Sequence, residues 1–248
     1  MVDYSLFEIL GIFGITFFAG IINVVAGGGS LFVLPFLIDV MGVNHLIANC
    51  TNRVAILAQC SSASYQFKQK GIDLPGPTKL WIGLSIVGAI IGAILTLYID
   101  KDAFMRLLGF VMIAAAILTM VPKTNPAKMA KYHQRLLPIS MFFIGIYGGL
   151  IQAGTGLIML TVYQALYSKD LVQANAVKVL LVASYTCIVL VIFIIQGLID
   201  WRLAGILIIG NVLGSLVGSH LAITKGNSFL KKALIVALLL MAIKLIFF

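Results

Sequence analysis

The chain has 248 residues, of which 61% are hydrophobic and 10% are charged, and its formal net charge is +9. Soluble domains carry roughly a quarter charged residues, so this composition excludes a soluble globular protein and indicates a polytopic helical membrane protein. In such a protein the positive charge reports orientation, because lysine and arginine concentrate in cytoplasmic loops. We therefore expect no nucleic-acid partner.

The first half of the chain predicts one broken helix and three complete spans. Residues 6–26 are apolar, a triple glycine follows, and the apolar stretch 31–40 is too short for a bilayer, which takes about 20 residues to cross. We predict that these two segments form a hairpin whose short arm returns to the face it entered from. The complete spans are expected at residues 45–67, 79–99 and 103–121.

The second half has the same plan, after a basic segment at residues 123–136. Residues 138–152 lead into a second glycine cluster and a short apolar arm at 157–167. The fold class we predict is therefore an all-α polytopic membrane protein with two repeats, each a glycine-broken hairpin plus three transmembrane helices. The repeats are residues 1–122 and 137–248, and the remaining spans are 171–196, 202–224 and 229–248.

The two halves are also related residue by residue. Asn175 lies 126 positions after Asn49, and with one residue of slip Gly154-Thr155-Gly156 matches Gly27-Gly28-Gly29. An apolar duplication with helices broken at corresponding places is typical of transporters that bind their substrate between the repeats.

A second set of matching glycines has a different interpretation. Gly214 and Gly218 lie 126 positions after Gly88 and Gly92, and each pair has the spacing of small residues that pack helices closely. With no polar neighbours, these glycines are expected to serve packing alone, and alanine is expected to be tolerated at Gly88.

The loop charges predict that the second repeat is inverted. If each hairpin enters and leaves on one face, most loop cations share a face, and Lys101, Arg106 and Arg202 lie on the other. This arrangement places both termini outside and residues 123–135 in the cytoplasm. Counting each broken pair as a single span would make the repeats parallel and put residues 68–79 on the face opposite residues 123–135.

The glycine clusters are candidates for binding an anion. Glycine lets a helix break and leaves backbone N–H groups uncovered, and the start of the following arm adds the positive end of a helix dipole. A sulfonate, sulfite or carboxylate group would suit such donors, whereas close helix packing is the alternative interpretation. The candidate residues are Gly27, Gly28, Gly29, Ser30, Gly154, Thr155 and Gly156.

A polar patch follows each cluster and supplies the candidate cations. A cation within an apolar helix costs a few kcal/mol unless it faces a cavity or a partner, so Arg53 and Lys178 are the strongest candidates for neutralising an anion. For Arg53, reaching the membrane interface is the alternative. The remaining polar candidates are Asn49, Asn52 and Asn175 in the patches, and Asn23 and Gln152 before the clusters.

Other residue types point away from enzymatic or ATP-driven function. No Gly-Lys-Ser/Thr follows the triple glycine, so it is no P-loop, and we expect no catalytic residue, no metal site and no cofactor. The three cysteines, Cys50, Cys60 and Cys187, are expected to be packing residues without a disulfide. We interpret Trp81 and Trp201 as interfacial anchors.

The pattern of residues resembles a known family. Gly20 to Pro35, containing Ala26-Gly27-Gly28-Gly29-Ser30, then Ala48-Asn49-Cys50-Thr51-Asn52, then a span ending in residues 65–71, is similar to the TauE/SafE sulfite exporter family of membrane permeases. Residues 145–178 repeat the pattern more loosely, and the resemblance covers essentially the whole chain. It implies export of small sulfur-containing anions, such as sulfite, sulfoacetate or related organosulfonates, across a prokaryotic cytoplasmic membrane.

The mechanism we expect is alternating access at a midplane site where the hairpin tips meet, with an anion-selective channel as the alternative. The expected partners are a small anionic substrate and membrane lipids, and a homodimer is left open.

Overall fold

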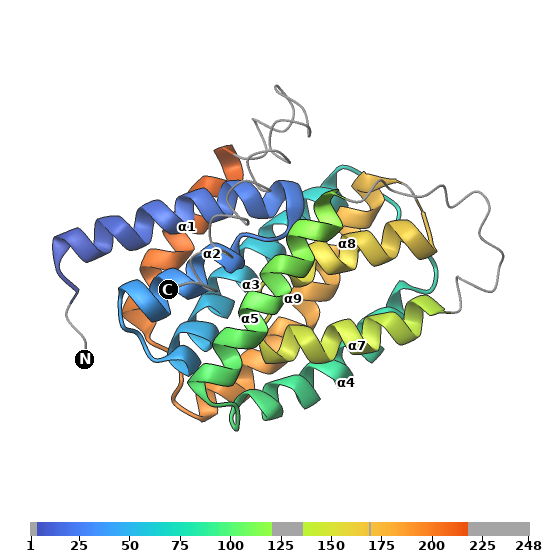
Figure 1. The fold of residues 1–248 in the computed structure, drawn as a ribbon. Coiled ribbons are helices and arrows are strands. Elements are labelled where there is room, and N and C mark those ends of the chain that lie inside the picture. Colours follow the sequence, from blue (N-terminus) through green and yellow to red (C-terminus); the bar gives the residue numbers. More distant parts are fainter. Residues whose placement is uncertain (1–3, 121–135, 169, 218–248) are drawn as a thin grey trace.

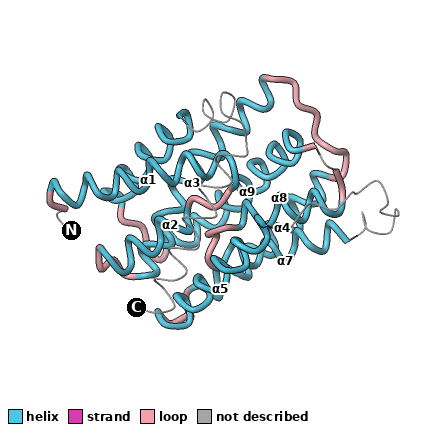
Figure 2. The backbone as a smooth tube through the Cα atoms, turned by 45° about the horizontal axis from the view of Figure 1, so that its top comes forward, coloured by secondary structure: helices cyan, strands magenta, loops and turns pink. Residues whose placement is uncertain are grey.

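The structure is a computed structural model that describes residues 4–120, 136–168 and 170–217, and within these ranges it contains helices and loops but no strand (Figures 1 and 2). The helices of the first half are α1 (Leu6–Ala26), α2 (Ser30–Pro35), the π-helical η1 (Phe36–Val40), α3 (His45–Gln69), α4 (Thr78–Thr96) and α5 (Lys101–Met120). Those of the second half are α7 (Leu136–Leu150), α8 (Thr155–Leu166), α9 (Leu171–Ile195) and the final described helix (Trp201–Val217).

The predicted elements agree with these helices to within a few residues at most ends. The last predicted span, 229–248, and nearly all of the basic linker lie outside the described residues. Side-chain caps explain several sharp starts, because the first N–H groups of a helix need an acceptor. Ser5 and Glu8 form a capping box at α1, while Asn44 accepts a hydrogen bond from Leu46 at α3 and Asp170 caps α9.

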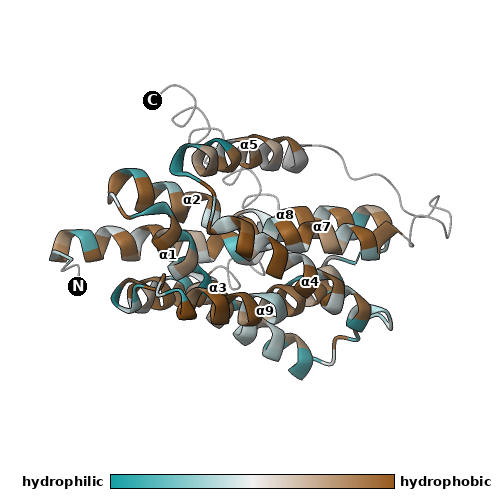
Figure 3. Ribbon diagram, turned by 90° about the horizontal axis from the view of Figure 1, so that it is seen from below, coloured by the Kyte–Doolittle hydropathy of each residue, from teal (hydrophilic) through white to brown (hydrophobic). Residues whose placement is uncertain are grey.

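The apolar surface agrees with a multi-pass membrane protein. Among the described helices, α1, α4 and α9 contain segments long and apolar enough to cross a bilayer. Large hydrophobic side chains are exposed along them, and brown, apolar ribbon dominates the helices in Figure 3. Lipid tails would cover such side chains in a membrane.

Each broken helix pair begins and ends at one face. Tyr4 and Glu8, at the start of α1, line the same shallow hollow as Met41 and Gly42, which follow η1. The pair α7 and α8 behaves likewise at the other end of the bundle, because the end of α8 packs on Trp81 at the start of α4, and α7 runs parallel to α4.

The central helices α3 and α9 run antiparallel. At one end, the side-chain amide of Gln173, near the start of α9, donates to the carbonyl of Asp73, beyond the end of α3. At the other end, the backbone N–H of Asp200, beyond α9, donates to Thr51 near the start of α3. We call these two ends the Lys70 face and the Asp200 face.

Glycines set two close helix crossings, and the two crossings correspond. A Cβ atom at Gly145 of α7 would overlap the carbonyl oxygen of Ser85 in α4, and one at Gly20 of α1 would overlap that of Asn211 in the final described helix. Asn211 lies 126 positions after Ser85. In each crossing, a helix from one half of the chain packs against the broken helix pair of the other half.

Two sequence expectations about these helices were wrong. A Cβ atom at Gly88 would overlap the carbonyl oxygen of Phe142, so even alanine does not fit there without moving α7. Trp81 is 1% exposed and packs edge-on against Tyr163 and Tyr167, which makes it a core residue rather than an interfacial anchor.

We expect Gly88→Ala to lower the thermal unfolding midpoint of the purified protein, since overpacking of this kind costs about 1–3 kcal/mol. Gly83→Ala, in the same helix, is the matched control, because nothing lies within 4 Å of the added Cβ atom there. That control should be neutral or stabilising. Equal midpoints for the two variants would show that the α4–α7 crossing is looser than the structure indicates.

Candidate functional site

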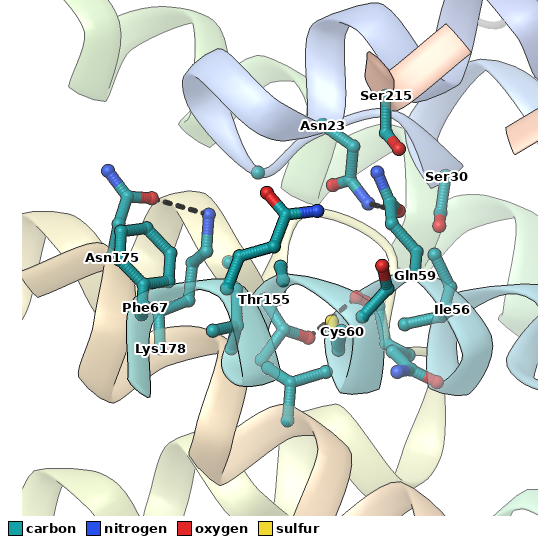
Figure 4. Close-up of a pocket in the computed structure, with 18 of the residues that line it drawn as sticks. Asn23, Ser30, Ile56, Gln59, Cys60, Phe67, Thr155, Asn175, Lys178 and Ser215 are labelled. Carbon is teal, nitrogen blue, oxygen red and sulfur yellow. Dashed lines mark hydrogen bonds between the residues drawn. The ribbon is translucent and has the colours of Figure 1, made fainter. Parts of the chain in front are cut away.

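A cavity of about 380 Å³ lies between α3, α9 and the two hairpin tips (Figure 4). Its inner end is formed by the buried Gly27, Ser30, Gln152 and Thr155 and by the half-buried Gly156. Its outer end is formed by the last turns of α3 and the first turn of α9, where the lining residues include Gln66, Lys70 and Val172 and are exposed. Within the part of the chain that the structure describes, the cavity therefore opens on the Lys70 face and reaches the middle of the bundle.

The two glycine clusters touch at the inner end. A Cβ atom on Gly27 would lie 2.7 Å from the carbonyl carbon of Gly156, and one on Gly156 would lie 2.8 Å from the carbonyl oxygen of Gly27. Gly27 and Gly154 also have positive φ angles, +75° and +74°, which side chains other than glycine rarely adopt. Glycine at these positions thus serves both the break and the close approach of the tips.

Lys178 is the buried cation of the cavity. It is 5% exposed, it lines the cavity, and its Nζ donates a hydrogen bond of 2.8 Å to Oδ1 of Asn175 (Figure 4). Among the described lining residues none is an aspartate or glutamate. A lysine can donate three hydrogen bonds, so Lys178 retains donors for a bound anion.

Polar side chains near the inner end form three separate hydrogen-bonded pairs. Asn23 donates to Oε1 of Gln59 at 2.6 Å, which leaves the Gln59 amide nitrogen as a donor (Figure 4). Ser30 accepts a hydrogen bond from Asn52 at 3.1 Å, so the Ser30 hydroxyl proton is available to another acceptor. The side-chain oxygen of Gln152 makes no hydrogen bond, although its nitrogen donates to Thr186.

Two of the expected backbone donors are already used within the hairpins. The N–H of Gly27 donates to the carbonyl of Asn23 and caps α1, while the N–H and the hydroxyl of Thr155 both donate to the carbonyl of Gln152. These two N–H groups are therefore not available to a bound anion, which differs from the sequence expectation.

Arg53 does not line the cavity, and neither does Asn49. Arg53 is fully buried, and its guanidinium donates to the carbonyls of Gly148 and Gly149, at 2.8 and 2.6 Å. Asn49 donates to the carbonyl of Leu150 at 2.9 Å. Both side chains thus satisfy the last carbonyls of α7, which have no partner within their own helix; Arg53 also does not extend to the membrane interface.

The sequence candidates therefore separate into two groups. Those that line the cavity are Asn23, Gly27, Ser30, Gln152, Thr155, Gly156, Asn175 and Lys178. Those that do not are Gly28, Gly29, Asn49, Asn52, Arg53 and Gly154. Asn52 remains next to the cavity through its hydrogen bond to Ser30.

Sequence reasoning missed part of the lining on α3. Ile56, Gln59, Cys60 and Ala63 follow Asn52 at helical spacing and line the cavity, so extending the face of Asn52 toward the end of the helix would have found them. Cys60 is thus a cavity residue as well as a packing residue. The three cysteines are free thiols.

Polar contacts close the Asp200 face. The Tyr4 hydroxyl donates to Asp200 at 2.8 Å, and the Asp200 backbone N–H donates to Thr51 at 3.0 Å. Burial, with Asp200 nearby, raises the pKa of Tyr4 above its ordinary value, so the phenol stays protonated and keeps donating at physiological pH. These contacts tie the chain's first residues to α3 and to the end of α9.

Comparisons with known proteins identify the family to which this chain belongs. Residues 12–245 match the family model described as "Sulfite exporter TauE/SafE". The chain is 26% identical to the "Probable membrane transporter protein YfcA" of Escherichia coli (strain K12), over 96% of this chain and 90% of the relative. It is also 26% identical to the "Probable membrane transporter protein ORF9" of Sinorhizobium sp, over 99% of this chain and 95% of the relative.

A protein of Haemophilus influenzae with the name "Probable membrane transporter protein" is 25% identical, over 95% of this chain and 93% of its own length. No solved structure matches the chain. The family match spans nearly the whole chain and agrees with its apolar helices, so this chain is a multi-pass membrane transporter that belongs to the TauE/SafE sulfite exporter family.

Proposed function

We propose that the protein is a secondary transporter that exports small sulfur-containing anions, such as sulfite, sulfoacetate or related organosulfonates, by alternating access. The anion binds at the inner end of the cavity, between the hairpin tips. Lys178 neutralises its charge, while Ser30, Gln59 and Asn175 orient its oxygens. The sulfur chemistry is supported by the family description, and the site is argued from the residues.

One observation indicates that the substrate is an anion. Lys178 is a buried lysine in a cavity whose described lining contains no carboxylate. Burying an ammonium group without a counter-ion is costly in a membrane protein. A bound anion removes that cost, whereas a bound cation would increase it.

The size and polarity of the cavity support a small organic or inorganic anion. A volume of about 380 Å³ is near the lower end of small-molecule sites, roughly 300–1,000 Å³. Polar groups gather around Lys178 and Gln59, while Ile56, Val179 and Val182 form an apolar wall. A sulfonate or sulfite head group can meet the polar side while an organic body contacts the wall.

Alternating access is supported by the closed Asp200 face and by the correspondence between the halves. The antiparallel α3 and α9, and the two glycine crossings, whose partner residues Ser85 and Asn211 are 126 positions apart, are what inverted repeats would produce. A protein built in this way has a second arrangement available, with the roles of the repeats exchanged and the cavity open on the Asp200 face.

Flux measurements in proteoliposomes test the function. Radiolabelled sulfoacetate uptake is expected to saturate with concentration and to be accelerated by unlabelled sulfoacetate inside the vesicles. Sulfite should compete, and sulfate and acetate serve as comparison anions. Flux that rises linearly with concentration, without acceleration from the other side, would support the anion-selective channel instead, and no flux of any sulfur anion would remove the proposed substrate class.

The predicted topology can be tested separately with single-cysteine variants. In each variant the three native cysteines are replaced by serine. Lys70→Cys and Lys128→Cys should react with a membrane-impermeant maleimide from the cytoplasmic side, and Gly197→Cys should react from the outside, because the loop charges orient the protein in this way. Measuring labelling in right-side-out and inside-out vesicles separates the faces. Labelling of Lys70→Cys and Gly197→Cys from the same side would contradict inverted repeats.

A further inference from the structure

Arg53 has an unusual role for a buried arginine in a membrane protein. Its two terminal nitrogens bind neutral carbonyls at the end of α7, Gly148 and Gly149, and its guanidinium lies 5.1 Å from the centre of the Phe193 ring. The end of a helix carries unpaired carbonyls and the negative end of its dipole. Arg53 therefore holds the tip of the second hairpin against α3 and α9, and it does not line the cavity that opens on the Lys70 face.

The residues of α9 that line the open cavity can be compared with the residues of α3 that lie 126 positions earlier. The lining residues of α9 are Val172, Asn175, Lys178, Val179, Val182 and Tyr185. The residues 126 positions earlier form one face of α3: Leu46, Asn49, Asn52, Arg53, Ile56 and Gln59. Ile56 and Gln59 already line the present cavity, so this face continues it toward the Asp200 face.

The same relationship holds for the aromatic residues. Phe193, which Arg53 covers, lies 126 positions after Phe67. Phe67 lines the open cavity, near its outer end and on the Lys178 side (Figure 4), whereas Phe193 is fully buried. Phe67 thus faces the open cavity beside Lys178, whereas its counterpart Phe193 is covered by Arg53.

We propose that Arg53, Asn49 and Asn52 form a second anion site, which opens on the Asp200 face when Arg53 releases the tip of the second hairpin. In that arrangement Lys178 takes the reciprocal role and binds the last carbonyls of α1, which ends at Ala26. Arg53 is a positioning residue in the structure described here and contacts the substrate in the other state. This inference rests on the proposed alternating-access function.

The consequence is that Arg53 and Lys178 stabilise opposite states. Removing Arg53 should favour the state open on the Asp200 face, since its hydrogen bonds to α7 exist only in the present state. Removing Lys178 should favour the present state, because the clamp on α1 would be lost. A merely structural role would give both variants the same effect.

The experiment measures thiol reactivity at matched positions in purified protein without substrate. The reporters are Gln66→Cys, at the outer end of the present cavity, and Ile192→Cys, its counterpart 126 positions later, each with the native cysteines replaced by serine. The ratio of their reaction rates with a small charged thiosulfonate reports the balance of the two states. Arg53→Met should shift this ratio toward Ile192→Cys by roughly tenfold or more, and Lys178→Met should shift it the other way.

Two further variants keep the result decisive if Arg53→Met does not fold. Asn49→Leu removes the third hydrogen bond from α3 to the end of α7 and should shift the ratio in the same direction as Arg53→Met, by less. Arg53→Lys keeps the charge and should restore much of the wild-type ratio. Two outcomes would overturn the proposal that Arg53 and Lys178 stabilise opposite states. In the first, the ratio shifts in the same direction in Lys178→Met as in the Asn49 or Arg53 variants. In the second, the ratio is unchanged in the Asn49 and Arg53 variants. Transport assays answer the separate question of whether sulfur anions are the substrate.

Discussion

Lys178→Met should abolish measurable binding of the transported anion while making the protein more resistant to heat. The substitution removes the charge that faces the cavity but keeps the length and apolar stem of the side chain. Removing one partner of a buried ion pair costs about 3–5 kcal/mol, which corresponds to a loss of affinity of ~100-fold or more. Without the anion, however, the buried ammonium group destabilises the fold.

The measurement is calorimetric titration of purified protein with sulfoacetate and sulfite, combined with thermal unfolding in the absence of ligand. Lys79→Ala is the matched control, because Lys79 is an exposed cation on the same Lys70 face and should change neither value appreciably. Wild-type affinity in Lys178→Met would remove Lys178 from the site. A lower unfolding midpoint would show that Lys178 is needed for the fold instead.

Gly156→Ala should stop transport in a protein that still inserts and folds. Its Cβ atom would lie 2.8 Å from the carbonyl oxygen of Gly27, so the two hairpin tips would have to separate at the inner end of the cavity. Gly27→Ala should have the same effect, since its Cβ atom would approach the backbone of Gly156 to 2.7 Å. Counterflow in proteoliposomes measures the loss.

Gly71→Ala separates the two reasons for glycine at position 27, the positive φ and the close contact with Gly156. Gly71 has a similar φ, +67° against +75°, but nothing lies within 4 Å of the Cβ atom it would gain. Backbone strain alone therefore costs this control roughly 1–2 kcal/mol of stability, and it should still transport. Normal counterflow in Gly156→Ala would mean that the contact between the tips is not required during the transport cycle.

Helix positions and the contact of the glycine clusters follow from local signals. The apolar lengths, the capping residues and the glycine breaks predict α1, α3 and α9 closely, and the repeat predicts that Gly27 and Gly156 belong to corresponding tips. Lys178 can also be recognised from the sequence as a candidate site residue. It lies one helical turn after Asn175, and a lysine is rare within an apolar helix. These features depend on spacing within one helix or on comparison of the halves.

The role of Arg53 depends on which helix end lies opposite it. Helical spacing assigns Arg53 and Asn49 to one face of α3, but it does not reveal that the last carbonyls of α7 are packed there. The same limit applies to Trp81, whose position at a span start suggests an interface, although α8 covers it. Contacts between helices distant in sequence decide both cases.

The most direct test of the account is to locate the bound anion. Selenite is a close analogue of sulfite, and the anomalous scattering of selenium would mark it in crystals of the protein. With the cavity open on the Lys70 face, we expect one site within hydrogen-bonding distance of Nζ of Lys178, beside Gly27 and Gly156, that disappears when sulfoacetate is added in excess. A selenium site only among the loop lysines, or one that persists with sulfoacetate present, would contradict it.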